Sequence, residues 1–237
     1  MPSCTFDLVS LLKPFTADAV MNGVATLIGA FLGAMLAFLF QLLLNRKQVQ
    51  KATLMSTHRM LFCLLQQMNT IMLVQKDFIF PHLNDPGRFI SIPAIHEFDI
   101  EKNSFDFSTF SFMLESSESR MIMYDLYLAQ ESYIEALRAV NVRSRLHREE
   151  VQPRLASAGI GNGTTVTNED VKRVLGPLVF PTIVTTTDQV IEVLKSAFAK
   201  LAKSKKEFRA YVVKRFNTKD FTDFDFPETY GLSSETK

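Results

Sequence analysis

The sequence contains little cysteine, little histidine and almost no net charge. Its two cysteines, Cys4 and Cys63, stand on either side of a long apolar run, so they cannot form a disulfide if that run crosses a membrane. Its four histidines include no HxxxH pair, and neither cysteine has a partner at metal-ligand spacing, so we expect no metal site. The 26 basic and 25 acidic residues give a net charge of +1, which argues against a dedicated nucleic-acid-binding protein.

Motifs typical of enzymes are also missing from the sequence. The glycine-rich stretch 159–163 lacks both the Lys-Ser/Thr pair of a P-loop and the GxGxxG spacing, so we interpret it as a linker between helices. None of the serines can be assigned to a strand-turn-helix elbow with a histidine and an acidic partner. Asp223 and Asp225 are typical of an acidic solvated tail rather than of a divalent-ion site. We therefore expect no cofactor and no enzymatic activity.

Apolar residues, in contrast, are concentrated between Val20 and Leu44. This stretch has no charged side chain in 25 positions, and as a helix it reaches about 37 Å, enough to cross a hydrocarbon core about 30 Å thick. Its Leu, Ile, Phe and Val side chains favour insertion by on the order of 4–8 kcal/mol in total. The sequence therefore predicts one transmembrane helix over residues 19–44.

Two alternatives to a membrane span fit the sequence less well. A helix buried in a soluble core would need more surrounding chain than remains here, because the run is apolar on every side. A cleaved signal peptide has a basic start and roughly 7–15 apolar residues, whereas this run is longer and its leader is not basic.

Basic residues around the run predict its orientation. Lys13 stands alone before it, whereas Arg46, Lys47, Lys51 and Arg59 follow within fifteen residues. Because basic flanks remain in the cytoplasm, we expect residues 1–18 to form a short external tail of a cell-membrane protein and the domain after the span to lie in the cytoplasm.

Small residues recur every four positions within the predicted span, at Ala25, Gly29, Gly33 and Ala37. Residues of this size at this spacing form a shallow groove in which two helix backbones approach closely. Glycine and alanine are also merely frequent in membrane spans. The pattern nevertheless favours a homo-oligomer that self-associates through the span.

The chain beyond the span has the pattern of long amphipathic helices. Residues 45–80 contain no proline or glycine and carry apolar residues at helical spacing. A second such pattern covers 116–150, opened by Ser116, Ser117 and Glu118 as capping residues. A third begins at Thr167, is interrupted by Gly176-Pro177 and Pro181, and resumes over 187–216. The fold class is therefore all-α, with the span continuing into an antiparallel cytoplasmic bundle of about three helices over 45–216 and a core that includes Leu65, Leu137 and Leu201.

Two aromatic stretches depart from the helical pattern. Residues 88–114 carry phenylalanines at period two and are expected to be short extended segments. The aromatic and acidic tail 217–237 contains Phe221, Phe224 and Phe226. We expect both stretches at the end of the bundle far from the membrane, where they pack on each other or where the tail docks a partner.

An arginine cluster at the end of the second helix suggests contact with anionic lipid or phosphate. Arg138, Arg143, Arg145 and Arg148 occur without an intervening acid, and Arg138, Arg145 and Arg148 fall toward one face of a helix. If this helix returns to the membrane, each cation can gain about 1 kcal/mol from anionic lipid. The alternative is a solvated face on which Glu131, Glu135, Glu149 and Glu150 neutralise the arginines.

These patterns lead to one functional expectation and one alternative. We expect a single-pass membrane protein that self-associates and recruits an unidentified cytoplasmic protein as a scaffold or accessory protein. The alternative is a membrane-perturbing effector of the toxin or anti-phage defence type. The layout is similar to that of many bacterial membrane proteins, some of them from anti-phage systems, but no residue motif carries this similarity.

Overall fold

The structure is a computed structural model that describes residues 17–100, 102–161, 166–218, 220, 221 and 223. All regular secondary structure in this part of the chain is helical, which confirms the all-α class. The chain divides into two compact units, Met1–Ala52 and Thr53–Lys237, and each is described by itself.

Helix α1 (Ala17–Val74) contains the apolar run and continues well beyond Leu44, as the absence of proline and glycine predicts. A π-helical turn, η2 (Gln75–Ile79), and a 3-10 turn, η3 (Phe80–His82), complete it. Pro81 and the turn Asn84-Asp85-Pro86-Gly87 end the helix, and Oδ1 of Asp85 accepts a hydrogen bond of 2.7 Å from the Gly87 amide.

Among the described residues, two helices are long and apolar enough to cross a membrane. One is the helical stretch Val20–His82, and 0% of its most apolar 18 residues are buried. The other is α5 (Asn168–Phe216), in which 22% of the corresponding 18 residues are buried. Length and composition alone also select core helices of soluble proteins. The buried side chains of α5, such as Leu194, Leu201 and Phe208, belong to the core of the second unit.

The segment between α1 and α3 (Ser117–Leu146) is mostly irregular, and the prediction of extended segments over 88–114 is wrong at both ends. Residues Arg88–Ser91 form a single helical turn, α2, and Phe107–Leu114 form the 3-10 helix η4. Asp106 starts η4 by accepting a hydrogen bond of 2.8 Å from the Ser108 amide.

The irregular segment, residues 92–100 and 102–106, has no partner strand among the described residues, and side chains of α3 bind its backbone instead. The amides of Ile95, Phe98 and Phe105 donate to Ser144 Oγ at 3.2 Å, Asn141 Oδ1 at 2.9 Å and Gln130 Oε1 at 2.8 Å. The segment therefore lies along α3 without forming a sheet, because its backbone donors are satisfied by side chains.

Helix α3 (Ser117–Leu146) begins as predicted. The side chains and amides of Ser116 and Ser119 form a reciprocal capping box at its first turn. A π-helical turn, η5 (His147–Val151), and the short α4 (Gln152–Ser157) follow it.

Helix α5 keeps the predicted start and kink but resumes earlier than expected. Thr167 caps its first turn, and Gly176 adopts φ 78°, a left-handed conformation that favours glycine. The chain returns to helical geometry at Pro177 rather than near residue 187. Proline is tolerated at Pro177, the first position after the kink, where no helical hydrogen bond is lost, and Pro181 follows within the next turn.

One hydrophobic cluster joins η4 and the three long helices of the second unit, with contributions such as Leu64 of α1, Tyr133 of α3 and Leu201 of α5. Leu65, Leu137 and Leu201 are all buried, and Leu137 and Leu201 both belong to the first cluster. A second cluster forms around Phe89, Val151, Val171, Leu175 and Ile183.

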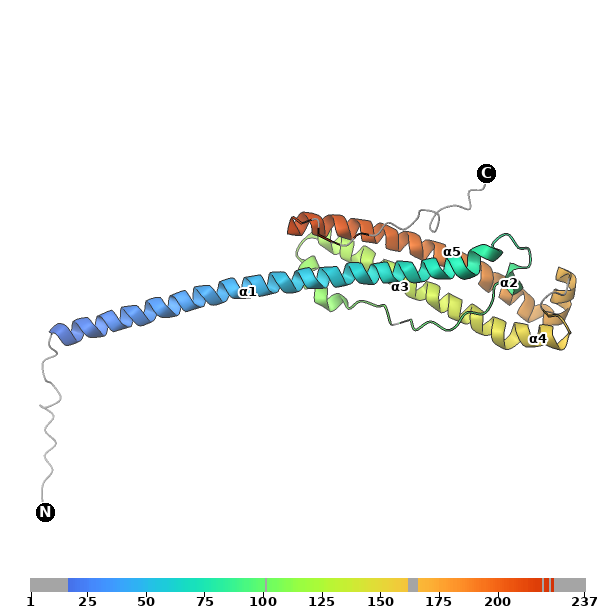
Figure 1. The fold of residues 1–237 in the computed structure, drawn as a ribbon, viewed down its shortest axis with the longest axis horizontal. Coiled ribbons are helices and arrows are strands. Elements are labelled where there is room, and N and C mark those ends of the chain that lie inside the picture. Colours follow the sequence, from blue (N-terminus) through green and yellow to red (C-terminus); the bar gives the residue numbers. More distant parts are fainter. Residues whose placement is uncertain (1–16, 101, 162–165, 219, 222, 224–237) are drawn as a thin grey trace, which may run out of the picture. The chain divides into compact units, whose positions relative to one another are not determined.

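Hydrogen bonds within the second unit give the helix directions. Three hydrogen bonds connect α3 and its N-terminal flank with α5: Arg143 with Thr187, Ser132 with Lys200, and Glu115 with Arg215. The two helices run antiparallel, because residue numbers fall along one as they rise along the other. The part of α1 within the second unit, from Thr53 onward, runs in the same direction as α3 (Figure 1). The irregular segment between them brings the chain back along α3. The expectation that the second long helix returns along the first is therefore wrong.

Candidate functional site

The small residues of the predicted self-association face leave an open surface in the first unit. Ala25, Gly29, Gly33 and Ala37 are all exposed. A methyl group added at Gly29 or Gly33 would meet no atom within 4 Å. Nothing in the described first unit fills this groove, and self-association through it stays a prediction.

Three arginines of the cluster, Arg138, Arg145 and Arg148, are exposed, and their contact with lipid or phosphate stays a prediction. Arg145 and Arg148 share one carboxylate oxygen of Glu97, at 3.2 and 3.5 Å, while Arg138 is exposed on its own. Arg143 points inward and is only 2% exposed. The carboxylate that pairs with these arginines belongs to Glu97 of the irregular segment. The residue pattern of the helix alone does not reveal this pairing.

Phe221 of the tail is a core residue. It is 3% exposed, and its ring lies 4.9 Å from that of His58 and 5.9 Å from that of Phe216. A buried ring cannot contact a partner, so the prediction that Phe221 docks one is corrected to a packing role. Phe224 and Phe226 lie outside the described residues.

The last part of the stretch 88–114 and Phe221 of the tail approach the same end of the second unit, but not the expected one. The guanidinium of Arg215 lies 5.3 Å from the ring of Phe112, and neighbouring Phe216 contacts Phe221. Because Phe221 also contacts His58, this is the end at which α1 enters the unit. The opposite end holds the residues around Phe89 and Arg143.

Arg143 joins three elements at that opposite end. Its Nη2 donates to the carbonyls of Phe89 at 3.1 Å and Ile92 at 2.6 Å, its Nη1 to Pro93 at 2.8 Å, and its Nε to Thr187 Oγ1 at 3.3 Å. Burial lowers the pKa of the Arg143 guanidinium to about 10, so it stays charged at neutral pH. This arginine fixes α2 and the start of the irregular segment against α5.

His147 supports the same segment from the π-helical turn η5. Its Nε2 lies 3.1 Å from the carbonyl of Ile90, and its buried Nδ1 has no hydrogen-bond partner in the part of the chain that the structure describes. Burial, and to a lesser degree the charge of Arg143, lowers the pKa of His147 to about 4. The ring is therefore neutral near pH 7.

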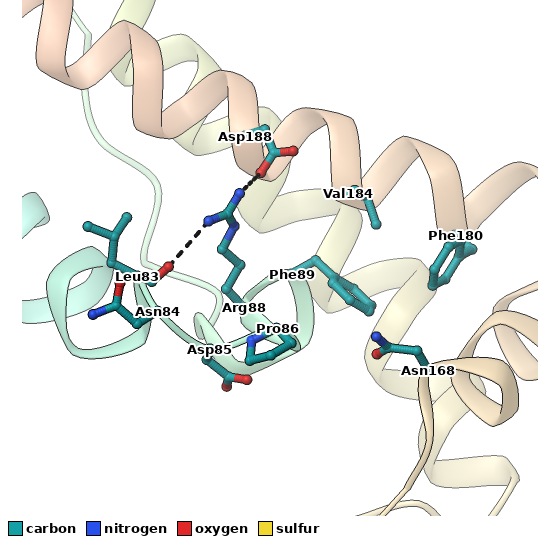
Figure 2. Close-up of a pocket in the computed structure, with 10 residues that line it drawn as sticks. All are labelled: Leu83, Asn84, Asp85, Pro86, Arg88, Phe89, Asn168, Phe180, Val184 and Asp188. Atoms are coloured by element: carbon teal, nitrogen blue, oxygen red, sulfur yellow. Dashed lines mark hydrogen bonds and ion pairs between the residues drawn. The ribbon is translucent and has the colours of Figure 1, made fainter. Parts of the chain in front are cut away.

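A pocket of about 600 Å³ lies where the end of η3 and α2 meet α5 (Figure 2). Its lining combines charged, amide and apolar side chains: Leu83, Asn84, Asp85, Pro86, Arg88, Phe89, Asn168, Phe180, Val184 and Asp188. Small-molecule sites occupy roughly 300–1,000 Å³ and show this mixture of apolar walls and a few polar groups. This pocket is the candidate functional site.

The charged part of the pocket is the pair of Arg88 and Asp188. Nη2 of Arg88 lies 2.7 Å from Oδ1 of Asp188, and its Nη1 donates to the Leu83 carbonyl at 3.2 Å. The side chains keep 38% and 49% of their exposure, so water or a ligand reaches both. Asp85 adds a second carboxylate whose pKa is held below its usual value by hydrogen bonds from Ser91 and the Gly87 amide.

The apolar part of the pocket is built around two aromatic rings. Phe89 and Phe180 meet edge to face, with centroids 5.4 Å apart and an interplanar angle of 79°. Figure 2 shows Val184 between Asp188 and Phe180 along α5, and Asn168 below the two rings. The arrangement can bind a ligand with one polar and one apolar end.

The sequence offered only a partial signal for this site. The turn Asn84-Asp85-Pro86-Gly87 was recognisable as the end of a helix, and Arg88 follows it. Asp188 lies 100 residues further along the chain, so no local pattern could have paired the two.

Cys63 offers no reactive thiol. Its Sγ donates to the Asn103 carbonyl at 2.8 Å, and burial raises its pKa to about 11. Because the thiolate is the nucleophile, a thiol with this pKa is inert near neutral pH.

Comparison of the chain with protein-family models, with curated proteins and with solved structures gives no match in any of the three.

Proposed function

We propose that this chain is a single-pass membrane protein that self-associates through its span and recruits a soluble partner with a helical cytoplasmic body. The observation that supports this proposal best is the apolar part of α1. Leu27 and Leu36, nine residues apart and so on opposite sides of the helix, are 71% and 63% exposed. A helix apolar on every side is stable in lipid and poorly soluble in water.

The basic flank supports the proposed orientation. Four basic residues follow the span within fifteen positions, against Lys13 alone before it. The external N-terminus and cytoplasmic body follow from the retention of basic flanks in the cytoplasm.

An exposed apolar strip on α3 supports partner recruitment by the body. Met121, Tyr124 and Leu128 are 63%, 56% and 38% exposed, and their spacing places them along one helix face. Such a face fits the apolar groove or helix of another protein. With Phe221 buried, this strip is a better candidate for docking than that residue.

Membrane extraction tests the anchoring. The full chain should remain with membranes after alkaline carbonate treatment, whereas a chain without residues 20–44 should be released. Release of the full chain by carbonate would contradict the proposal. A membrane-potential dye separates the scaffold from the alternative effector: overexpression of a scaffold leaves the potential unchanged, and depolarisation would favour the effector.

A further inference from the structure

We infer that the pocket between α2 and α5 binds a small zwitterion with an apolar group, such as an α-amino acid with an aliphatic or aromatic side chain. This inference goes beyond the proposed membrane anchoring and does not depend on it. The pocket volume of about 600 Å³ exceeds what a single ion needs and suits a ligand of this size.

The polar end of the pocket presents opposite charges side by side. Arg88 uses Nη2 for Asp188 and Nη1 for the Leu83 carbonyl, and a guanidinium has five N–H donors, so donors remain for a carboxylate. The ion pair uses Oδ1 of Asp188, and among the described residues Oδ2 of Asp188 has no hydrogen-bond partner. A ligand with one carboxylate and one ammonium group matches Arg88 and Asp188 respectively.

The net charge of the lining disfavours a multiply charged anion. Arg88 is the cation of the lining, and Asp85 and Asp188 are its carboxylates. Asp85 accepts from the Gly87 amide on Oδ1 and from the Ser91 hydroxyl on Oδ2, so its carboxylate is held in place and adds negative charge to the lining. A phosphate group would face two carboxylates, whereas an ammonium group gains from both.

The apolar end has the shape for an aliphatic or aromatic group. The rings of Phe89 and Phe180 and the side chains of Val184 and Pro86 line this part of the pocket (Figure 2). Burial of apolar surface against these groups supplies a favourable contribution that a bare ion cannot obtain.

Both walls of the pocket are held in place from the protein interior. Arg143 binds the carbonyl of Phe89 on one wall and the hydroxyl of Thr187, which precedes Asp188, on the other. Arg88 then joins the two walls directly. Binding groups that are fixed before the ligand arrives lose little conformational entropy on binding.

Calorimetry on the full chain in detergent micelles or nanodiscs tests the inference, with L-leucine and L-phenylalanine as probes. We expect saturable binding of at least one of them at or below about 10 mM. L-Leucinamide, which lacks the carboxylate, and N-acetyl-L-leucine, which lacks the ammonium group, should bind at least about tenfold more weakly than the parent amino acid.

Three variants connect binding to the pocket. Asp188→Asn and Arg88→Gln should each weaken binding by about tenfold or more, and Val184→Trp should abolish it by filling the apolar end. Lys203→Gln, which breaks the exposed pair of Lys203 and Glu207 on the same helix, is the matched control and should bind as the wild type does. Circular dichroism verifies that each variant is folded.

Three results would overturn the inference. The first is no saturable binding of either amino acid by the folded wild type. The second is equal binding of the amide or the N-acetyl analogue, which would replace the zwitterion by a simple cation or anion. The third is unchanged binding by folded Val184→Trp, which would place the ligand elsewhere.

Discussion

At the scale of single residues, the end of the second unit that carries the pocket depends on two buried polar side chains. Arg143 satisfies three backbone carbonyls that no helix or sheet pairs, and His147 contacts a fourth. Removing such a partner leaves a buried acceptor unsatisfied, at a cost of about 1–3 kcal/mol for each group. These side chains therefore determine where the segment after α1 can lie.

His147 should make folding stability depend on pH. Its folded pKa of about 4 is below the value of about 6.5 for the unfolded chain, so between these values the unfolded state binds the extra proton. The free energy of unfolding should therefore fall by on the order of 3 kcal/mol as the pH drops from 6.5 to 4, and should be independent of this group above 6.5.

Urea unfolding of wild type and His147→Gln at several pH values measures this contribution. The variant should lose stability less steeply in this range, whereas His96→Gln, at an exposed position, should behave as the wild type does. Identical slopes for wild type and His147→Gln would show that His147 does not titrate as inferred.

Core leucines should be far more sensitive to truncation than exposed charges. Leu137 and Leu201 are 1% and 0% exposed and belong to the same cluster. Leu137→Ala or Leu201→Ala should each lower the free energy of unfolding by roughly 2–5 kcal/mol, because burial is lost and a cavity remains. Lys203→Ala, on the exposed face of α5, should change it by less than about 0.5 kcal/mol. Comparable losses for Leu201→Ala and Lys203→Ala in urea unfolding would contradict this core.

At the scale of elements, the role of the tail and the role of the span can be tested separately. The tail contributes Phe221 to the core, and Asp223 binds Lys205 at 3.0 Å and Arg209 at 3.1 Å. A soluble fragment that begins near Gln48 should therefore lose thermal stability when residues 217–237 are deleted. Phe221→Ala alone should reproduce much of this loss, at about 3–5 kcal/mol. An unchanged melting temperature in both variants would show that the tail is not part of the fold, and the tail would then be a better candidate for docking a partner.

The small-residue face of the span should control self-association. Gly33→Ile fills the groove between two helices and should weaken the dimer signal in a membrane two-hybrid assay while leaving insertion intact. Leu32→Ile, one position away, is a matched control that adds no volume to the groove. A dimer signal for Gly33→Ile equal to that of the wild type would show that self-association does not use this groove.

The sequence predicted those elements whose start or end is set by residues within a few positions of each other. The caps at Ser116 and Thr167 depend on residues three positions away, and both are confirmed. The 3-10 helix η4 was missed because the phenylalanines suggested a period of two, although Asp106 and Ser108 carry a local start signal. The pair of Arg88 and Asp188 and the burial of Arg143 depend on contacts between distant segments, which periodicity cannot reveal.

At the scale of the whole molecule, the two units differ in whether their apolar side chains are exposed or buried. In the first unit the large side chains of Val20–Leu44 are exposed and apolar. The second unit buries its own core and carries surface ion pairs such as Arg145 with Glu97. This difference is the physical basis of the proposal that α1 is anchored in a membrane and that the second unit functions beside it.

Protease protection in intact cells tests the central claim most directly. With an epitope tag at each end, we predict that an external protease removes the N-terminal tag and leaves a protected fragment that carries the C-terminal tag, and that permeabilised cells lose both. Cleavage of the second unit from outside intact cells would contradict the proposed orientation, and protection of both tags in intact cells would contradict the single span.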